Sequence, residues 1–214
     1  MVENTENELI KTFLSSEIRD SSKIRGDSDH HVLTLFSIAL ASKGQNYIEL
    51  GVRKGITTMP ILYAAYLNDG KLFSVDEEST SFKCPEHMDS NWEFTKSNSL
   101  EFLNNWELGK IDFIYIDDWH SYKHVKRELE LIDPYIAPTS IILLHDLMYG
   151  GTEPYYHSDL SLKKGQWADG GPYRAVSELD PNFWEYSTLP WSSGLTILRK
   201  KYSTNNKYEP PSWH

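Results

Sequence analysis

The sequence predicts an α/β fold built around a mostly parallel β-sheet. Short apolar segments of strand length alternate along the chain with longer segments of helical periodicity, as in β-α-β units. The segment Ser140–Leu144 is almost entirely Ile and Leu, which is typical of a central parallel strand buried on both faces. Two final apolar segments, at 184–188 and 194–199, flank a turn that contains proline and predict a closing hairpin.

The chain has 214 residues, enough for one sizeable hydrophobic core and most simply one domain. We expect an N-terminal helical cap at residues 1–45, an α/β core at 46–200 and a loose tail at 201–214. Within the cap, residues 9–18 can form a short amphipathic helix with Leu9 and Phe13 directed inward.

Charge and cysteine content exclude several classes of function. The formal net charge of −10 argues against nucleic acid or an anionic membrane as the main partner. The single cysteine, Cys84, excludes an intrachain disulfide, the N-terminus does not resemble a signal peptide, and no apolar run approaches membrane-spanning length. We therefore expect a cytoplasmic protein that binds neither nucleic acid nor a membrane.

The first expected helix of the core region runs from His30 to about residue 42. Asp29 precedes it as a candidate N-cap, and Leu33, Phe36 and Leu40 recur at helical spacing. The adjacent pair at 30–31 is interpreted as the entry to this helix rather than as a ligand set. Gly44 ends the helix.

The next expected elements are a strand at 46–50, a glycine turn and a second helix. Pro60 lies inside that helix, where proline is tolerated only in the first turn. Placing Thr57 at the N-cap meets this requirement, and the helix then extends to about residue 67.

The remaining elements alternate in the same way. We expect strands at 71–75, 92–95, 111–116 and 140–144, with a helix after Ser99 and another after Ser121. The helix after Ser121 has Tyr122, Val125, Leu129 and Ile132 on one face. Residues 147–172 form a long loop, and a last helix opens at 171–172 and ends near residue 179.

Polar residues follow four of the expected strands directly. They are Gly51, Asp76, Asp117 and Asp146, and ligands of parallel sheets bind outside the carboxyl ends of the strands. Carboxylates buried together at this edge need compensation by cations, hydroxyl donors or a metal.

The turn after the first strand is consistent with a ligand-binding loop, although an ordinary strand–turn–helix joint remains an alternative. Its glycine spacing is neither the G-x-G-x-x-G of dinucleotide enzymes nor a P-loop. Glu49, just before the turn, disfavours a pyrophosphate and suits a ligand with an ammonium group. Asp76 fits a carboxylate that accepts hydrogen bonds from two ribose hydroxyls, or alternatively a simple strand cap.

Four segments carry a family resemblance: residues 49–55 (ELGVRKG), 75–76 (VD), 113–117 (FIYID) and 141–146 (IILLHD). Over residues 32–200 the chain resembles a class I S-adenosylmethionine-dependent methyltransferase. Its motifs are similar to those of small-molecule O-methyltransferases related to catechol O-methyltransferase. They are also similar to those of bacterial methyltransferases with an IDG-x-H-x-Y…HD pattern, although this chain has Asp118 where the pattern has glycine.

The resemblance implies a doubly wound, seven-stranded, Rossmann-like sheet whose last strand is antiparallel. It also implies S-adenosylmethionine as the cofactor, with Glu49 near its ammonium group and Asp76 on the ribose. The methionine portion would lie along the turn, at Gly51, Val52, Arg53, Gly55 and Thr57. Ser97, Asn98 and Ser99 would lie near the adenine, and Asp117 and Trp119 would also contact the cofactor.

The segment at 117–120 resembles the Asp-x-Trp-Lys run of the catechol-type enzymes. There the Asp binds Mg²⁺, the Trp lies beside adenine and the Lys is the general base. Asp117 and Trp119 match, while His120 replaces the lysine and, near its unperturbed pKa, is a reasonable base at neutral pH. The alternatives are that His120 caps the following helix and that Trp119 is ordinary core packing.

Asp146 matches the second metal-binding Asp of these enzymes. Neighbouring strands lie about 4.8 Å apart, so Asp117 and Asp146 can reach one Mg²⁺ or another divalent cation. Leu147 stands where the family has a third ligand, so His145, His120 or water would have to complete the site. Without a metal, Asp146 would orient the substrate or pair with Arg174.

The expected activity is methyl transfer from S-adenosylmethionine to a hydroxyl of a small molecule. The loop that contains Tyr155, Tyr156, His157 and Trp167 is a candidate lid. Two alternatives are a non-catalytic or non-methylating methyltransferase-like protein that binds the cofactor or a metal, and an NAD-dependent dehydrogenase. The methyl acceptor and the assembly, monomer or homodimer, stay open.

Overall fold

The computed structural model describes residues 28–149 and 170–202. The helix expected at 9–18, the candidate lid with Tyr155, Tyr156, His157 and Trp167, and the tail beyond residue 202 lie outside the described residues. Among the residues that are described, no helix has the length and apolar character needed to cross a membrane.

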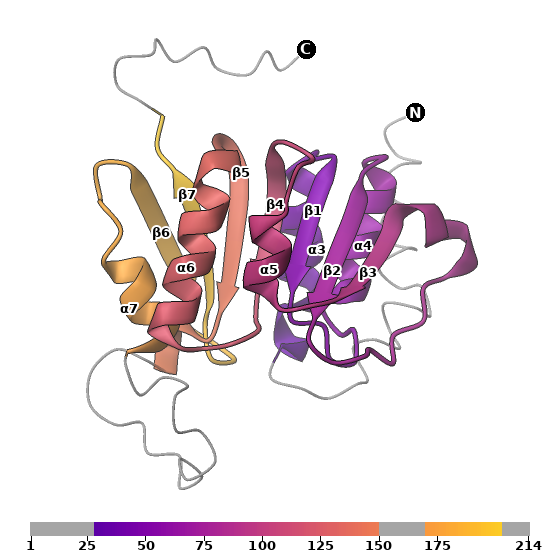
Figure 1. Ribbon diagram of the computed structural model, residues 1–214, viewed down its shortest axis with the longest axis horizontal. Helices are drawn as coiled ribbons and strands as arrows, with labels where there is room; N and C mark the ends of the chain where they lie inside the picture. Colours follow the sequence, from indigo (N-terminus) through magenta and orange to yellow (C-terminus); the bar gives the residue numbers. More distant parts are fainter. Residues whose placement is uncertain (1–27, 150–169, 203–214) are drawn as a thin grey trace, which may run out of the picture.

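Seven strands form one sheet in the order β3-β2-β1-β4-β5-β7-β6 (Figure 1). The strands are β1 (Asn46–Leu50), β2 (Lys71–Asp76), β3 (Trp92–Lys96), β4 (Ile111–Ile116), β5 (Ile136–His145), β6 (Trp184–Leu189) and β7 (Leu195–Lys200). β1 to β5 are parallel to one another, and β7 runs antiparallel to both β5 and β6. The predicted doubly wound sheet with its antiparallel C-terminal hairpin is confirmed.

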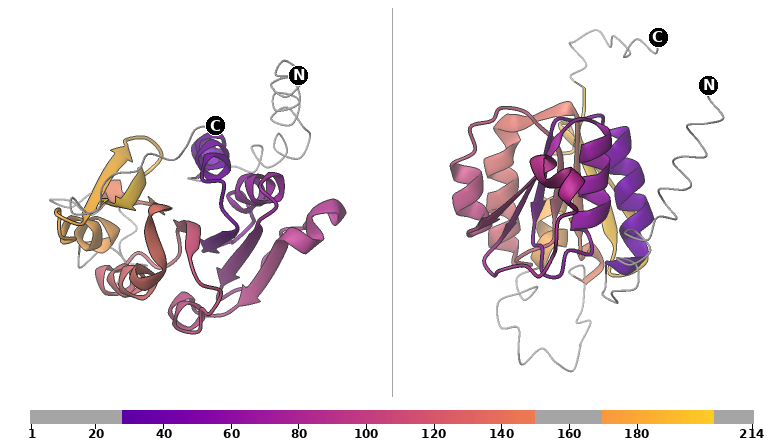
Figure 2. Two further views of the ribbon diagram at one scale, coloured as in Figure 1. Left: turned by 90° about the horizontal axis from the view of Figure 1, so that it is seen from above. Right: turned by 90° about the vertical axis from the view of Figure 1, so that its right-hand side faces the viewer.

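Helices cover both faces of the sheet (Figure 2). α3 (Val32–Ala41) and α4 (Thr58–Leu67) pack on one face, and α5 (Ser99–Asn104), α6 (Tyr122–Ile132) and α7 (Gly171–Ser177) on the other. Each layer encloses its own cluster of buried apolar side chains. Short 3-10 helices are η1 (Asp29–His31), η2 (Glu86–Asn91), η3 (Asp133–Tyr135) and η4 (Leu147–Tyr149).

The buried face of α3 differs from the predicted one. Leu33 is 57% exposed, whereas Leu35, Phe36 and Ala39 are fully buried against the α4 layer. The α-helix begins only at Val32, after η1, so Asp29 is not its N-cap. Phe36 is buried as predicted and Leu40 packs against the same cluster, so the predicted face is wrong at Leu33 alone.

The start of β5 was also missed. The predicted strand began at Ser140, where the continuous run of Ile and Leu starts. The chain instead pairs Ile136 with Ile111 before a register shift. The Ser140 hydroxyl bridges the irregularity, donating to the Ile111 carbonyl at 2.6 Å and accepting from the Ala137 N–H at 3.0 Å.

Candidate functional site

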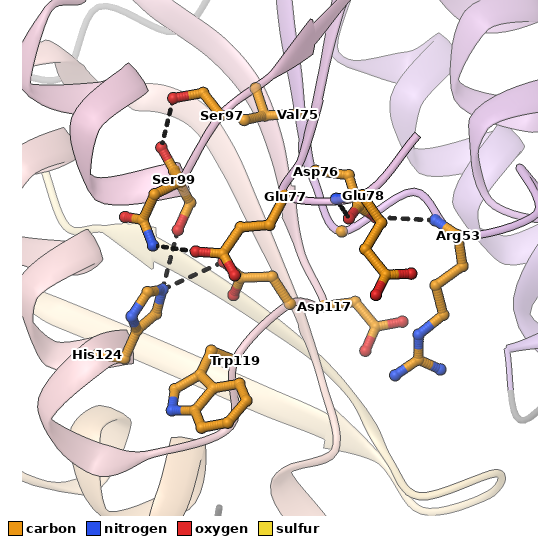
Figure 3. Close-up of a pocket in the computed structure, with 13 residues that line it drawn as sticks. Arg53, Val75, Asp76, Glu77, Glu78, Ser97, Ser99, Asp117, Trp119 and His124 are labelled. Atoms are coloured by element: carbon orange, nitrogen blue, oxygen red, sulfur yellow. Dashed lines mark hydrogen bonds and ion pairs between the residues drawn. The ribbon is translucent and has the colours of Figure 1, made fainter. Parts of the chain in front are cut away.

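Three of the four strand-end residues, Gly51, Asp76 and Asp117, line one cavity at the edge of the sheet where β1, β2 and β4 end (Figure 3). Its volume of about 520 Å³ lies in the usual range for small-molecule sites. Eight residues predicted to contact a cofactor line it: Gly51, Arg53, Asp76, Ser97, Asn98, Ser99, Asp117 and Trp119.

Gly51 allows the first turn to lie directly on the end of β4. Its φ is +88°, and a Cβ added there would stand 2.2 Å from the carbonyl oxygen of Asp117. Two backbone hydrogen bonds hold this arrangement, from the Gly51 N–H to the Val75 carbonyl and from the Asp117 N–H to the Leu50 carbonyl, both 2.9 Å. Only glycine fits here.

Asp76 braces the turn besides lining the cavity. Its Oδ2 accepts from the backbone N–H groups of Val52 at 2.8 Å and Arg53 at 3.0 Å, and its Oδ1 accepts from Glu78 N–H at 2.8 Å (Figure 3). An ionised carboxylate has about four acceptor positions. Three are in use, so Asp76 retains about one position for a ligand hydroxyl rather than the expected two.

Glu49 does not line the cavity, contrary to the expected contact with an ammonium group. Its carboxylate is fully buried and accepts from the hydroxyls of Thr57 (2.7 Å), Thr58 (2.9 Å) and Ser74 (2.7 Å). Burial raises its pKa to about 7, against the opposing effect of these hydroxyls. Glu49 lies under the turn and ties α4 to β1 and β2.

The other predicted turn residues also shape the loop from behind the cavity. Val52 is buried and offers its N–H to Asp76. Gly55 has a φ of +79° and stands so close to Phe82 that a Cβ would come within 2.5 Å of its ring. Thr57 precedes α4, with Pro60 in the first turn as predicted, but its hydroxyl binds Glu49 instead of capping the helix.

The opposite wall of the cavity comes from the β3–α5 and β4–α6 connections. Asn98 caps α5, its Oδ1 accepting from Leu100 N–H at 2.9 Å, while its amide donates to Glu77. Trp119 is 48% exposed at the cavity (Figure 3). This exposure rules out the alternative that Trp119 is ordinary core packing.

A second group of side chains joins the cavity at Asp117. Nε2 of His120 lies 3.3 Å from Oδ1 of Asp117 and 2.8 Å from Oδ2 of Asp146. The side chains of His120 and Asp146 are only 4% and 5% exposed. These three residues, the Asp117 cluster, have ligand atoms that all lie within 4.8 Å of one another, close enough to hold one metal ion.

Neighbouring strand residues and two residues near position 30 complete this cluster. Nδ1 of His145 lies 3.2 Å from Oδ1 of Asp146, and its ring makes an edge contact with the buried ring of His31. Oδ2 of Asp117 accepts from the hydroxyls of Tyr115 (3.1 Å) and Ser28 (3.3 Å). Ser28 and Tyr115 were not among the predicted site residues, and His31 was interpreted as a helix entry. Ser28 and His31 lie far from the strand ends in sequence, whereas Tyr115 stands two residues before Asp117 in the FIYID segment, where alternation along the strand could have placed both side chains on one face.

The carboxylates and histidines of the cluster stabilise each other's charged forms. Burial opposes ionisation of Asp117 and Asp146, but hydrogen bonds and charge from His120 and His145 outweigh it and hold both pKa values below the usual range. Burial likewise opposes protonation of the two histidines, yet the carboxylates raise the pKa of His120 to about 9 and that of His145 to about 11. Two carboxylates and two imidazolium groups balance in charge.

These values alter the role expected for His120. With a pKa of about 9 it is protonated at neutral pH and, as the cluster stands, cannot take a proton from a substrate. It is not the cap of α6 either, because the N-cap is Ser121, whose hydroxyl accepts from His124 N–H at 3.2 Å.

The backbone at Asp146 is unusual in a way that suits a binding site. Its φ is +66°, a left-handed conformation that non-glycine residues seldom adopt and that concentrates at functional sites. The next side chain, Leu147, is buried and offers no ligand atom. Arg174, the alternative partner for Asp146, forms an ion pair with Glu178 at 2.8 Å.

Several solved structures with the same fold are described as methyltransferases, all of low sequence identity to this chain. PaMTH1 of Podospora anserina, solved with SAH (S-adenosylhomocysteine), is 13% identical with a TM-score of 0.62, over 94% of this chain and 96% of that one. A putative caffeoyl-CoA O-methyltransferase of Staphylococcus aureus is 15% identical with a TM-score of 0.61, over 92% and 99%. MycE of the mycinamycin pathway, in complex with Mg, SAH and mycinamycin VI, is 14% identical with a TM-score of 0.61, over 93% and 58%. These likenesses show the fold.

The sequence itself matches a family model over part of its length. No curated protein matches it, but residues 48–147 match the family model described as a methyltransferase domain. The matched segment begins in β1 and ends just after Asp146, so it contains the glycine turn, Asp76 and the whole Asp117 cluster. This chain therefore carries a class I S-adenosylmethionine-dependent methyltransferase domain.

Proposed function

We propose that this protein methylates a hydroxyl group of a small molecule, with S-adenosylmethionine as the methyl donor and a divalent cation at the Asp117 cluster. The observation that carries the proposal is the position of Asp117. It lines the cavity beside the glycine turn and is at the same time a member of the buried cluster with His120 and Asp146. A cofactor in the cavity and an acceptor at the cluster would therefore be neighbours.

The chain's own groups fit the cofactor. S-adenosylmethionine supplies an activated methyl group when bound. The protein offers it a turn that Asp76 holds in place, a half-exposed Trp119 ring for stacking and, at Asp76, Glu77 and Glu78, acceptors for hydroxyl groups. Solved neighbours bound to SAH or SAM, such as the O-methyltransferase of Bacillus cereus with SAH, support the same use of this fold.

The Asp117 cluster fits a divalent cation. Two buried carboxylates and an imidazole nitrogen converge, and the contact that Oδ1 of Asp146 makes among the described residues is the ion pair with Nδ1 of His145 at 3.2 Å. A cation bound there would lower the pKa of an acceptor hydroxyl. The Mg in the MycE complex supports a metal in this fold. The imidazole also makes Mn²⁺ or another transition metal a suitable occupant.

We assign His120 as the third metal ligand, in the place that Leu147 cannot fill, in preference to the general base. Its Nε2 faces both carboxylates from a position that is 4% exposed. In this geometry His120 must lose its proton to bind the metal. The proton of the acceptor hydroxyl would then leave to solvent or to another group on the substrate side.

Calorimetric titration with SAH, NAD and ATP tests the cofactor. We expect SAH alone to bind, and Asp76→Ala to weaken SAH binding by at least tenfold, because the turn loses its brace and the ligand loses an acceptor. Glu93→Gln, at an exposed ion pair of the same sheet, is the control and should bind SAH normally. Binding of NAD without binding of SAH would overturn the proposal.

His120→Ala separates the two roles of this histidine. As a ligand, its loss should weaken Mn²⁺ binding by about 10- to 100-fold, the range of ligand-shell effects on metal affinity. Turnover on a panel of catechols and related hydroxyl compounds should then recover at high Mn²⁺. If Mn²⁺ affinity is unchanged while turnover falls and its dependence on pH is lost, His120 is the base. Full activity at low Mn²⁺ would exclude both roles.

A further inference from the structure

A second group of metal-ligating side chains lies on the α6 side of the cavity. It comprises Asp118, in the β4–α6 connection, and His124 and Glu128, one turn apart on α6. Their ligand atoms all lie within 4.8 Å of one another. No residue is shared with the Asp117 cluster, and the side chains of Asp117 and Asp118 join different groups although they are adjacent in sequence.

Nε2 of His124 is the centre of this group. It lies 3.2 Å from Oδ2 of Asp118, 3.4 Å from Oε1 of Glu128 and 2.9 Å from the hydroxyl oxygen of Ser99. Metal–ligand bonds of about 2.0–2.2 Å place neighbouring ligand atoms about 3–3.5 Å apart. The spacing already present in the protein is thus the spacing of a coordination shell.

Glu128 has few partners for a buried carboxylate. Its side chain is fully buried, and within the described residues its oxygens make no regular hydrogen bond, only the ion-pair contact of Oε1 with His124 at 3.4 Å. Oδ1 of Asp118 is likewise buried and makes no hydrogen bond within the described residues. An ionised carboxylate buried without hydrogen bonds is strongly disfavoured unless a cation or a metal compensates for it. One histidine does not supply enough donors for two carboxylates.

We propose that Asp118, His124 and Glu128 form a second divalent-cation site, distinct from the Asp117 cluster. One imidazole and two carboxylates form a donor set for Zn²⁺ or Mn²⁺ rather than for Ca²⁺, which takes oxygen ligands almost exclusively. Ser99 or water completes the shell.

The cavity gives a cation access to this site. Asp118, His124 and Ser99 all line it, and Figure 3 shows the His124 ring directed toward Ser99 at the cavity wall. A cation here would fix the 117–120 segment, including Trp119, to α5 and α6. The site therefore sits where it would hold one wall of the cofactor cavity in place.

Metal titration in an Asp146→Asn background tests this site apart from the first. The parent variant is stripped of metal with a chelator and titrated with Zn²⁺ by calorimetry, and with Co²⁺ by visible absorption, which reports the coordination geometry of the bound ion. We expect one Zn²⁺ per chain in this background. Adding Glu128→Gln or His124→Gln should weaken it at least 30-fold and remove the Co²⁺ absorption, while the exposed control His87→Gln should change neither.

Two outcomes would overturn the proposal. One is that Asp146→Asn binds no Zn²⁺, and the other is that Glu128→Gln and His124→Gln bind Zn²⁺ as tightly as their parent. Near-ultraviolet circular dichroism checks that each variant is folded. If Glu128→Gln does not fold, Asp118→Asn, in the connection outside α6, replaces it and should cause the same loss of affinity. The test measures only metal binding and folding. Its result therefore does not depend on whether the protein binds SAH or transfers a methyl group.

Discussion

The position of Glu49 shows how a residue can be identified correctly as special and still be given the wrong role. It precedes the glycine turn, where a carboxylate facing a cationic ligand is a natural interpretation. In the fold its side chain points to the α3–α4 face of the sheet, opposite Ser74 on β2 and near the first turn of α4. Three hydroxyls thus become its partners, and only the fold could show this.

Glu49 should make the stability of the protein decrease between about pH 4.5 and pH 7. Burial raises its pKa from the ordinary 4.5 to about 7, so over this interval the folded state keeps a proton that the unfolded chain releases. Because the folded state binds more protons, the free energy of unfolding falls by about 1.4 kcal/mol per pH unit, or about 3 kcal/mol in all. Below and above the interval Glu49 adds no slope.

Glu49→Gln removes this titration and measures it. The free energy of unfolding in urea is determined for both proteins at pH 5, 6 and 8. The wild-type value minus the variant value should fall by about 2–3 kcal/mol from pH 5 to pH 8. A constant difference would mean that the buried carboxylate ionises at its ordinary pKa, stabilised by the hydroxyls of Thr57, Thr58 and Ser74.

The positions of other single residues at the cavity were predictable because they depend on a local pattern. Asp76 and Asp117 end strands that the sequence marks clearly, and parallel strands bring such ends together whatever the side chains are. Trp119 follows from the same motif. His31 and His145 meet across more than 100 positions of sequence, and a contact of that kind leaves no periodicity or spacing to detect.

At the scale of elements, the β1–α4 turn depends on its contact with the end of β4. The turn crosses directly over the Asp117 carbonyl, which a side chain at position 51 would strike, and Asp76 then holds the next two backbone N–H groups. Cofactor binding and local stability therefore depend on the same backbone positions.

Gly51→Ala should destabilise the fold and abolish SAH binding. The added Cβ meets backbone atoms at 2.2 Å and the φ of +88° is unfavourable for alanine, so we expect a loss of about 3–5 kcal/mol in the free energy of unfolding. Gly109→Ala is the matched control. Its φ is +79° with nothing within 4 Å of the added Cβ, and it should cost about 1–2 kcal/mol from conformation alone. If urea unfolding shows the same loss of stability for Gly51→Ala and Gly109→Ala, the contact of the added Cβ with the Asp117 backbone is not what destabilises Gly51→Ala.

Elements were predicted best where one signal dominated. β1 and β4 have the predicted bounds because a continuous apolar run ends at a turn or a carboxylate. α6 has Val125, Leu129 and Ile132 buried, as its strong periodicity indicated. In α3 the prediction was wrong at Leu33, because the helix is apolar on several sides and the pattern alone does not show that Leu35 faces the core instead.

At the scale of the whole molecule, one sheet separates two apolar layers. The α5–α7 layer includes Leu144, and the α3–α4 layer includes the adjacent Leu143, because successive side chains of β5 point to opposite faces. Every central strand contributes to both layers. The two layers should therefore unfold together, although they touch only through the backbone of the sheet.

Leu143→Ala and Leu144→Ala test this coupling from the two sides. Both leucines are at most 1% exposed, and each truncation should lower the free energy of unfolding by about 2–5 kcal/mol through lost burial and the cavity left behind. The control, Leu33→Ala at a 57% exposed position, should stay within about 0.5 kcal/mol. In each variant, far-ultraviolet circular dichroism and tryptophan fluorescence should give one shared midpoint in urea. Trp106 belongs to one layer and Trp92 packs on the other, so divergent midpoints in Leu143→Ala would show that the layers unfold independently.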